Sequence, residues 1–516
     1  MSNHLVIAPI LLPLLVAALQ LLVGERRRRT TLALSIASCT GLVLACAALM
    51  HAVSGGEALA AVYRIGDWPA RFGIVLVADR LSALMVLLTS VLALALLPYA
   101  LGRWQHRGGH FQPLLQFLLM GLNGAFLTGD LFNLFVFFEV LLAASYGLAL
   151  HHPSAQRVGA GLHYIAINLL ASLLFLVGVS LIFGVTGTLN MAALAQLVPQ
   201  VPANTRALLH AGAAILGVAF LVKAAMWPLG FWLPRSYAAA PSAVAAMFAV
   251  MTKVGVYVLL RLSLLLFGAG AGAASAGFGS GWLLWGGAAT VATGVAGMLG
   301  ARELSRLAGY NVLVSSGSLL GAIGVGQPAV IAGALAYLVV STLAVAAFFL
   351  LAGLIAPRDD AEEAPLLEAY DPGGLALYAD EDESQPTQPA PVRLLAGGFF
   401  IAALLLAGLP PLSGFLAKFA LLAPLVGAGA EAMMLFALIV AGGLGTVVAM
   451  CRVGIQVFWE DDWVFPPIHN GAVASVAILL GLCLLLTVLG EAPMRYLQAT
   501  AAQLHWPDGY IRAVLP

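Results

Sequence analysis

Long apolar runs, separated by short polar or arginine-bearing segments, follow one another along almost the whole chain. A run of about 20 apolar residues crosses the hydrocarbon core of a bilayer as a helix. The runs are uniformly apolar and do not alternate, which favours helices over a closed barrel. The pattern predicts an all-α polytopic membrane protein with about 14 transmembrane helices, approximately over residues 4–23, 31–53, 77–101, 112–129, 131–150, 159–184, 208–248, 249–267, 281–299, 307–325, 328–355, 393–423, 431–458 and 471–490.

In two of these runs a proline lies near a lysine at membrane depth: Pro228 in the seventh run, and Pro410 with Pro411 in the twelfth. Proline cannot donate the helical hydrogen bond to the residue four positions earlier, so the carbonyl oxygens of Ala224, Leu406 and Ala407 are left free. Irregular backbone inside a membrane is tolerated only where protein or water covers it. Paired broken helices in two halves of a chain are typical of transporters built on inverted repeats.

Composition and loop charges agree with a membrane protein. Of the 516 residues, 62% are hydrophobic and only 9% are charged, against about 25% charged residues in soluble proteins. Arginines concentrate after odd-numbered spans, so the positive-inside rule predicts cytoplasmic odd-numbered loops and both termini on the outer side. The first span ends in ERRRR and is expected to be retained. The acid- and proline-rich segment 357–392 is predicted to be a cytoplasmic linker, or alternatively a cation-attracting or docking segment.

All three lysines of the chain, Lys223, Lys253 and Lys418, lie within apolar runs. A cation at membrane depth costs at least about 2.5 to 3.5 kcal/mol on insertion scales, so three such residues indicate a function. A desolvated lysine can gain and lose a proton near neutral pH, whereas arginine stays protonated. We therefore predict that the lysines relay protons. The alternative is that they are structural cations bound by neighbouring helix ends or carboxylates.

Other ionisable residues extend this pattern. Glu139 is the only acid deep within an apolar run, and we expect it to pair with Lys223 so that each sets the protonation of the other. The alternative is a static salt bridge between two helices. Asp130 lies at a span edge, where a carboxylate reaches water or a helix N-terminus. His163 could extend a proton path between Lys223 and Lys253.

Motifs of soluble enzymes are absent from the sequence, including the P-loop, the dinucleotide-binding glycine motif, the H-E-x-x-H zinc motif and the G-x-S-x-G elbow. The four cysteines have no metal-ligand spacing. We therefore expect no cofactor, no resident metal and no enzyme activity. The formal net charge of zero gives no reason to expect a nucleic-acid partner.

Four segments together resemble a known family: FFEVLL around Glu139, FLVKAAMWPLGFWLP around Lys223, APSAVAAMFAVMTKVGVYVLLR around Lys253 and GLPPLSGFLAKFALL around Lys418. The chain resembles, over about residues 75–455, the antiporter-like subunits shared by Mrp-type multisubunit cation/proton antiporters and the proton-pumping arm of respiratory complex I. The resemblance implies Glu139 and Lys223 as a coupling pair, Lys253 as the central relay and Lys418 as the terminal relay.

The resemblance also implies a domain organisation. Two inverted five-helix repeats, residues 112–267 and 281–458, would contain the broken helices 7 and 12, with a hydrated axis of charges through the membrane centre. N-terminal helices 1–3 occupy residues 1–111, and the last helix and tail occupy 459–516. The string TGDLFNLFVFFEVLLAASYGLAL, with Asp130 and Asn133, looks closest to the D-type subunit of Mrp antiporters.

Several positions depart from the complex I pattern. Val345 stands where many homologues carry a lysine, and serines around Ser315 and the string SYAAAPSAV stand where histidines occur. Water would therefore have to bridge Lys253 and Lys418. We expect a proton-translocating subunit of a sodium or potassium/proton antiporter in a bacterial inner membrane, working beside partner subunits. The alternatives are a pumping subunit of complex I or a membrane hydrogenase, and a scaffold whose buried charges only hold helices together.

Overall fold

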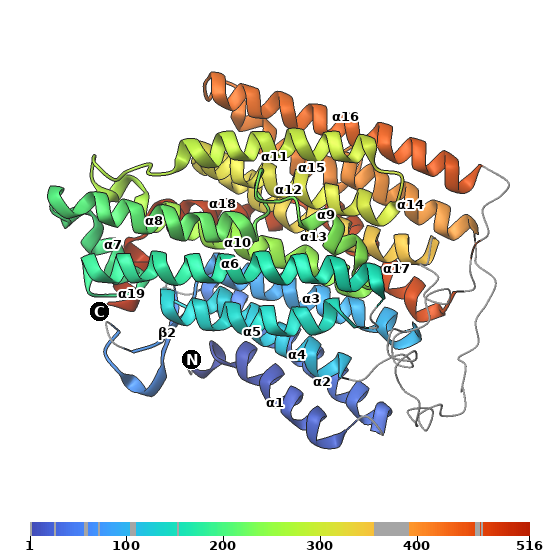
Figure 1. Ribbon diagram of the computed structural model, residues 1–516, viewed down its shortest axis with the longest axis horizontal. Coiled ribbons are helices and arrows are strands. Elements are labelled where there is room, and N and C mark those ends of the chain that lie inside the picture. Colours follow the sequence, from blue (N-terminus) through green and yellow to red (C-terminus); the bar gives the residue numbers. More distant parts are fainter. Residues whose placement is uncertain are drawn as a thin grey trace.

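Helices lying side by side along the long axis make up most of the molecule in the computed structural model (Figure 1). The structure describes residues 3–24, 27–55, 60–70, 73–103, 110–151, 154–355, 392–459, 465 and 468–515. The predicted acidic linker, 357–392, lies outside the described residues except for Val392, where a helix begins.

Three helices and a small hairpin form the N-terminal part. The helices are α1 (Ala8–Val23), α2 (Arg28–Gly55) and α3 (Arg80–Arg103). Between α2 and α3, strands β1 (Ala61–Arg64) and β2 (Val75–Ala78) pair antiparallel, with Ala61 opposite Ala78. The predicted third span began at residue 77, which is wrong by three residues because β2 pairs with β1 before the helix starts.

The same order of elements then occurs twice: three continuous helices, one interrupted helix and one further continuous helix. The first series comprises α4 (Phe111–Leu127), α5 (Leu131–Ala149), α6 (Ala155–Thr186), the interrupted pair α8 (Ala203–Lys223) and α9 (Leu233–Ala239), and α10 (Ser242–Phe267), with a short α7 (Met191–Leu197) inserted after α6. The second comprises α11 (Ser280–Gly300), α12 (Leu304–Val325), α13 (Pro328–Ile355), the interrupted pair α14 (Val392–Ala407) and α15 (Ser413–Leu422), and α16 (Ala430–Phe458). The division into repeats over 112–267 and 281–458 stays a prediction.

The second half of the seventh span is shorter than expected. Residues 242–248 belong to α10, the eighth span, and not to the interrupted helix. Ala240 is extended, with φ −65° and ψ 154°, because the ring of Pro241 disfavours helical backbone in the residue before it. The helix boundary therefore falls at Pro241.

The C-terminal part contains more helix than expected after the last predicted span. Helix α17 (Asn470–Val488) is followed by α18 (Glu491–His505) and α19 (Asp508–Val514). Helix α18 packs against α13, and α19 packs against α7. The segment after α17 thus returns to the bundle as two further helices.

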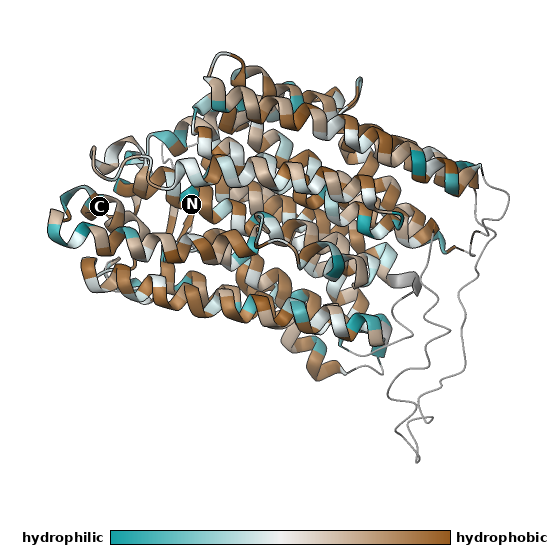
Figure 2. Ribbon diagram, turned by 45° about the horizontal axis from the view of Figure 1, so that its top comes forward, coloured by the Kyte–Doolittle hydropathy of each residue, from teal (hydrophilic) through white to brown (hydrophobic). Residues whose placement is uncertain are grey.

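The apolar helices agree with a polytopic membrane protein. Within the described residues, eleven helices are long and apolar enough to cross a membrane, and hydrophobic residues dominate the ribbon in Figure 2. The shorter apolar helices α1 and α4 and the broken pair α14–α15 make the set compatible with the expected fourteen spans, a number that length and composition alone do not fix.

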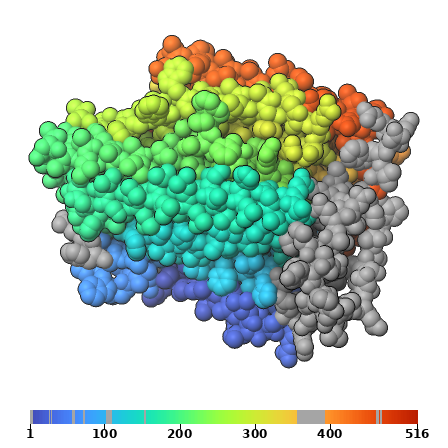
Figure 3. Space-filling model, in the orientation of Figure 1, coloured from blue at the N-terminus to red at the C-terminus, as the bar shows by residue number. Residues whose placement is uncertain are grey.

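Burial separates central from peripheral helices. The most apolar stretch of α10 is entirely buried and that of α13 nearly so, whereas less than half of the corresponding stretch is buried in α2, α6, α8, α16 and α17. Figure 3 shows successive segments as adjoining bands, from α1 and α2 at one edge to α16 at the other. Close packing of α11 on α12 requires small residues, since a Cβ on Gly287 would lie 2.4 Å from the backbone nitrogen of Gly321. The central helices α10, α12 and α13 carry Lys253, Ser315 and Ser341.

Candidate functional site

Lys223 is the last residue of α8 and lies at the first helix break. Its side chain is buried, and Nζ donates to the side-chain oxygen of Asn168 at 3.0 Å and to the backbone oxygen of Asn168 at 3.4 Å. The ring of Phe138 lies 5.8 Å from Nζ. The ammonium group is therefore held by neutral oxygens and an aromatic face.

Glu139 does not form the expected direct ion pair with Lys223. Among the described residues, no carboxylate oxygen of Glu139 lies within 4 Å of Nζ of Lys223, and Oε1 of Glu139 is buried without a hydrogen-bond partner. Glu139 still interacts electrostatically with Lys223 and with Tyr146. The physical reason is the position of α6, which carries Asn168 and packs against both α5 and α8. The Asn168 side chain therefore accepts the hydrogen bond of the Lys223 ammonium group in place of Glu139.

The first break contains the free carbonyl that its proline predicts. Helix α8 ends at Lys223, and the Ala224 oxygen accepts a hydrogen bond from the hydroxyl of Ser316 on α12. One turn further on, the backbone nitrogen of Trp227 donates to Oγ1 of Thr290 on α11 at 2.8 Å. Side chains of the second series thus satisfy the backbone that Pro228 leaves irregular, which is the protein cover that such backbone needs.

Lys253 lies in the middle of α10 and is 2% exposed. Its Nζ donates to Oγ of Ser315 on α12 at 2.7 Å, and Ser315 Oγ lies 2.9 Å from Oγ of Ser341 on α13. Both serines are buried. Three central helices therefore place one amine and two hydroxyl groups in a hydrogen-bonded chain.

Lys418 binds the second break. Its Nζ donates to the backbone oxygen of Leu406 at 2.9 Å and to that of Ala407 at 2.8 Å. These are the two carbonyl groups that Pro410 and Pro411 leave without helical partners. A cation at the C-terminal end of α14 also complements the helix dipole. The amine of α15 and the end of α14 therefore belong to one site.

A small cavity lies between the Lys253 and Lys418 sites. Its volume is about 10 Å³, close to the minimum that holds one water molecule. The cavity is lined by the two serines that follow Lys253, by the residue whose carbonyl binds Lys418, and by further residues of α12 and α13. These lining residues include Asn311, Ser315, Tyr337, Ser341, Val345 and Leu406. Residues of both sites therefore line the same small space.

Two secondary candidates have different outcomes. Asp130 is the N-cap of α5 and accepts from the backbone nitrogens of Phe132 and Asn133 at 2.8 and 2.9 Å, as expected for a carboxylate at a span edge. Burial raises the pKa of Asp130, against the effect of these two hydrogen bonds. His163 is exposed on α6, with Nδ1 3.0 Å from its own helix at the Gly159 oxygen. The expectation that His163 lies between Lys223 and Lys253 is therefore wrong, because that face of α6 points away from the bundle.

The sequence interpretation missed the neutral partners of the lysines. Asn168, Ser315 and Ser341 each lie within an apolar run, and a polar side chain inside a span faces the bundle interior more often than lipid. That signal was present for all three residues. Within the described ranges, no group of three or more His, Cys, Asp or Glu side chains could hold a metal ion.

The sequence matches a family model over residues 128–445, more than half of the chain, described as NADH:quinone oxidoreductase/Mrp antiporter, TM. The chain belongs to this family. The match spans α5 through most of α16 and so contains Glu139 and all three lysines. The family expected from the four sequence segments is thereby confirmed.

Two relatives from this family align along nearly the entire chain. The probable K(+)/H(+) antiporter D-type subunit of Rhizobium meliloti (strain 1021) is 50% identical over 529 residues, covering 99% of this chain and 98% of the relative. The Na(+)/H(+) antiporter D-type subunit of Alkalihalophilus pseudofirmus is 35% identical over 520 residues, covering 99% of both. These relatives are transporter subunits and not enzymes, as expected for this chain.

Solved structures share the fold. A chain of the Mrp complex from Dietzia sp. DQ12-45-1b superimposes with a TM-score of 0.83 at 28% identity, with all of both chains covered. A chain of respiratory complex I from Thermus thermophilus with bound NADH gives a TM-score of 0.76 at 21% identity, again over all of both chains. At that identity, the second comparison shows a common fold alone. The roles of Glu139, Lys223, Lys253 and Lys418 stay predictions.

Proposed function

We propose that this chain is the proton-translocating subunit of a multisubunit sodium or potassium/proton antiporter in a bacterial inner membrane. The observation that carries the proposal is the arrangement around Lys253 and Lys418: two buried amines, two hydroxyl groups and a water-sized cavity form a nearly continuous series. Full-length similarity to D-type subunits named for K(+)/H(+) and Na(+)/H(+) antiporters supports the antiporter class.

Proton transfer would begin at Lys253. Ser315 accepts a hydrogen bond from the Lys253 ammonium group, so the hydroxyl proton of Ser315 is free to point toward Ser341. A hydroxyl group both donates and accepts, so a proton given to one side is replaced from the other. A water molecule in the cavity would carry the proton from Ser341 to Lys418, as Val345 offers no ionisable group.

Glu139 and Lys223 would couple this movement to neighbouring subunits. The unpartnered oxygen of Glu139 leaves it free to approach Lys223 or to turn toward another chain. An approach would stabilise the ammonium form of Lys223, and a departure would favour release of its proton. The pair thus acts as an electrostatic switch at a distance, and the absence of a direct contact argues against the alternative of a static salt bridge.

Two alternative functions make different predictions. A pumping subunit of complex I or a membrane hydrogenase would work with redox partners, whereas full-length identity favours the D-type antiporter subunits. A non-transporting scaffold would need its buried amines only as helix ties, which the neutral acceptors of all three lysines also permit. Activity measurements distinguish the scaffold from the antiporter.

The decisive experiment is cation/proton exchange in everted vesicles from an antiporter-deficient host that expresses the whole complex. We expect Lys253→Leu to abolish exchange while the complex still assembles, because the buried relay loses its titratable group. The matched control is Thr342→Ala, which removes a buried hydroxyl group that donates only to the backbone of its own helix. Intact exchange in Lys253→Leu would favour the scaffold.

A further inference from the structure

A buried ion pair lies at the C-terminal end of α10, outside the series of lysines. Arg261 donates through both terminal nitrogens to Asp79, once in a short contact and once at 2.7 Å. Asp79 and Arg261 are 1% and 5% exposed. Oδ1 of Asp79 also accepts from the backbone nitrogen and the hydroxyl of Ser82 at 3.0 and 2.8 Å. Arg261 lies within α10, which continues to Phe267.

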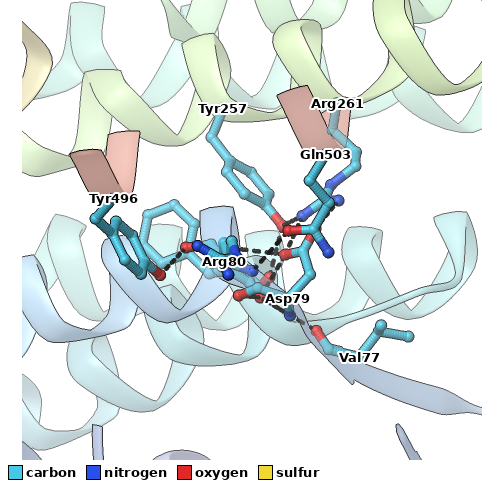
Figure 4. Close-up of polar contacts among 9 residues, drawn as sticks. Val77, Asp79, Arg80, Tyr257, Arg261, Tyr496 and Gln503 are labelled. Atoms are coloured by element: carbon cyan, nitrogen blue, oxygen red, sulfur yellow. Dashed lines mark hydrogen bonds and ion pairs between the residues drawn. The ribbon is translucent and has the colours of Figure 1, made fainter. Parts of the chain in front are cut away.

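Aromatic rings from separate parts of the chain enclose this pair. The guanidinium carbon of Arg261 lies 5.4 Å from the ring centre of Tyr257 and 5.2 Å from that of Tyr510 on α19. Tyr257 donates to the Phe126 oxygen on α4 at 2.6 Å. Figure 4 shows Tyr257, Arg261 and Asp79 converging at the junction of β2 and α3. The pair is thus buried, bidentate and enclosed by residues of α4, α10 and α19.

The neighbouring Arg80 ties the same place to the C-terminal helices. Its backbone oxygen accepts from the hydroxyl of Tyr496 at 2.7 Å, and its backbone nitrogen donates to Gln503 at 3.4 Å, both on α18. Figure 4 shows these contacts beside the ion pair. Residues 491–514 therefore contribute to closing this end of α10.

The ion pair lies in line with Lys253. Lys253, Tyr257 and Arg261 follow one another at intervals of four residues, so they share one face of α10. Eight residues of α-helix place Arg261 about 12 Å along the axis from Lys253. At an effective dielectric constant of about 20, two unit charges about 12 Å apart change a protonation equilibrium about tenfold. Lys253 has no carboxylate within 4 Å among the described residues, so a charge at this distance matters.

We propose that Asp79 is a positioning residue for proton transfer at Lys253, because it cancels the fixed charge of Arg261 on the same face of α10. When the ion pair is formed, the charges of Asp79 and Arg261 cancel, so Lys253 can stay protonated. With Asp79 neutralised or withdrawn, the uncompensated guanidinium group disfavours a second positive charge on Lys253. This inference rests on the proposed role of Lys253 in proton transfer.

Other ionisable groups near the two ends of this face are few in the described structure. Arg80 of α3, Tyr496 of α18 and Tyr510 of α19 surround the ion pair, together with Tyr257 of α10 itself. Near Lys253, α8 brings Lys223 and α13 brings Tyr337. Helix α5 also packs against α10 and carries Glu139, whose charge acts on Lys223 and not on Arg261. None of these groups adds a carboxylate that could replace Asp79 in compensating Arg261.

The test measures the pH dependence of exchange by the whole complex in everted vesicles. We expect Asp79→Asn to lower the pH of half-maximal exchange by about one unit, the tenfold effect of an uncompensated charge at this distance. Arg261→Gln leaves a carboxylate that Ser82 still binds, and we expect a shift of similar size to higher pH. The double variant carries neither charge, and its pH profile should return to that of the wild type.

Glu491→Gln removes an exposed carboxylate from α18 and serves as the control, with an unchanged profile expected. If the ion pair had only a structural role, the two single variants would not shift the pH profile in opposite directions. If only one single variant assembles, the shift of its pH profile still tests the proposal. Unchanged profiles in both single variants would overturn the proposal. Loss of assembly in both, with a normal double variant, would also overturn it, because the pair would then only hold helices.

Lys253→Leu separates this inference from the proposed function. Full exchange in Lys253→Leu would remove the proposed proton role of Lys253, and the inference with it. Loss of exchange in Lys253→Leu together with wild-type pH profiles in Asp79→Asn and Arg261→Gln would refute the inference alone. The two failures therefore give different results.

Discussion

At the scale of single residues, the three lysines share one kind of environment. Each ammonium group donates to neutral oxygens: an amide, a hydroxyl, or a pair of backbone carbonyls. A neutral acceptor does not fix the charge of its donor as a carboxylate does. Arg261, in contrast, is bound to Asp79 on both sides of its guanidinium fork. The three lysines and Arg261 therefore have two different kinds of partner.

We expect Glu139→Ala and Lys223→Ala each to abolish cation/proton exchange while the complex still assembles. The physical reason is that each removes one charge of the coupling pair, whereas neither removes a direct ion pair that holds α5 to α8. Exchange in everted vesicles, with assembly followed by native electrophoresis, measures both properties. Failure of either variant to assemble would instead support a structural role.

The hydroxyl relay gives a second prediction at this scale. We expect Ser315→Ala to lower the exchange rate by about 100-fold, at the low end of what a positioned proton-transfer group contributes. Lys253 would lose its 2.7 Å acceptor and its connection to Ser341. Ser315→Thr keeps the hydroxyl and should retain much of the rate. Equal rates in Ser315→Ala and the wild type would show that protons bypass this residue.

The sequence indicated which ionisable residues lie inside the membrane but not what they touch. Lys223, Lys253 and Lys418 are buried as expected, since only the bundle interior accommodates a cation. The partner of Lys223 was wrong because hydropathy does not fix rotation about a helix axis, and Asn168 was closer than Glu139. The predicted place of His163 between Lys223 and Lys253 was wrong for the same reason. The hydropathy pattern also contains no sign of the pair between Asp79 and Arg261, which are 182 residues apart.

At the scale of elements, the two broken helices are the features that the sequence located best. Pro228 and the pair Pro410–Pro411 mark the interruptions because a missing N–H has a fixed consequence for the helix. The hairpin, α7 and the last two helices were missed. These segments are short or amphipathic, so a search for long apolar runs does not detect them. Pro241 was overlooked as a boundary although it has the same chemistry as the other prolines.

The second break gives a prediction about an element. We expect the double variant Pro410→Ala/Pro411→Ala to lower exchange more than tenfold, a loss typical for a misplaced proton-transfer group. New N–H groups would bind the carbonyls of Leu406 and Ala407 and compete with Lys418 for them.

Pro328→Ala is the matched control for this variant. Pro328 is the first residue of α13, where the missing N–H would be unpaired in any case. Exchange at the wild-type rate in the double variant would show that the free carbonyls are dispensable. Exchange lost in the control would show that proline removal is harmful in itself.

At the scale of the whole molecule, burial increases from peripheral helices to α10 and α13. Peripheral helices keep apolar side chains exposed, such as Leu173, Phe183 and Leu444, as surfaces that face lipid or partner subunits do. Arginine positions extend this picture to sidedness, which stays a prediction.

We expect the loop before α12 to face the cytoplasm and the C-terminus to face outward, because arginines concentrate after odd-numbered spans. In a Cys451→Ser background, which removes the exposed cysteine, Glu303→Cys should react with an impermeant thiol reagent in everted vesicles. Asp508→Cys should react in right-side-out vesicles. The reverse pattern would invert the topology, and labelling of both positions from one side would contradict the count of spans.

The space bounded by Ser341, Tyr337 and Leu406 accommodates about one water molecule. A cavity of this size cannot contain a continuous chain of water molecules between the two halves of the protein. The single water molecule would have to reorient after each proton it transfers, before the next proton can follow. We therefore expect protons to move one at a time, and slowly when the complex is idle. A cell that maintains a gradient across this membrane would then lose little of it through a resting transporter.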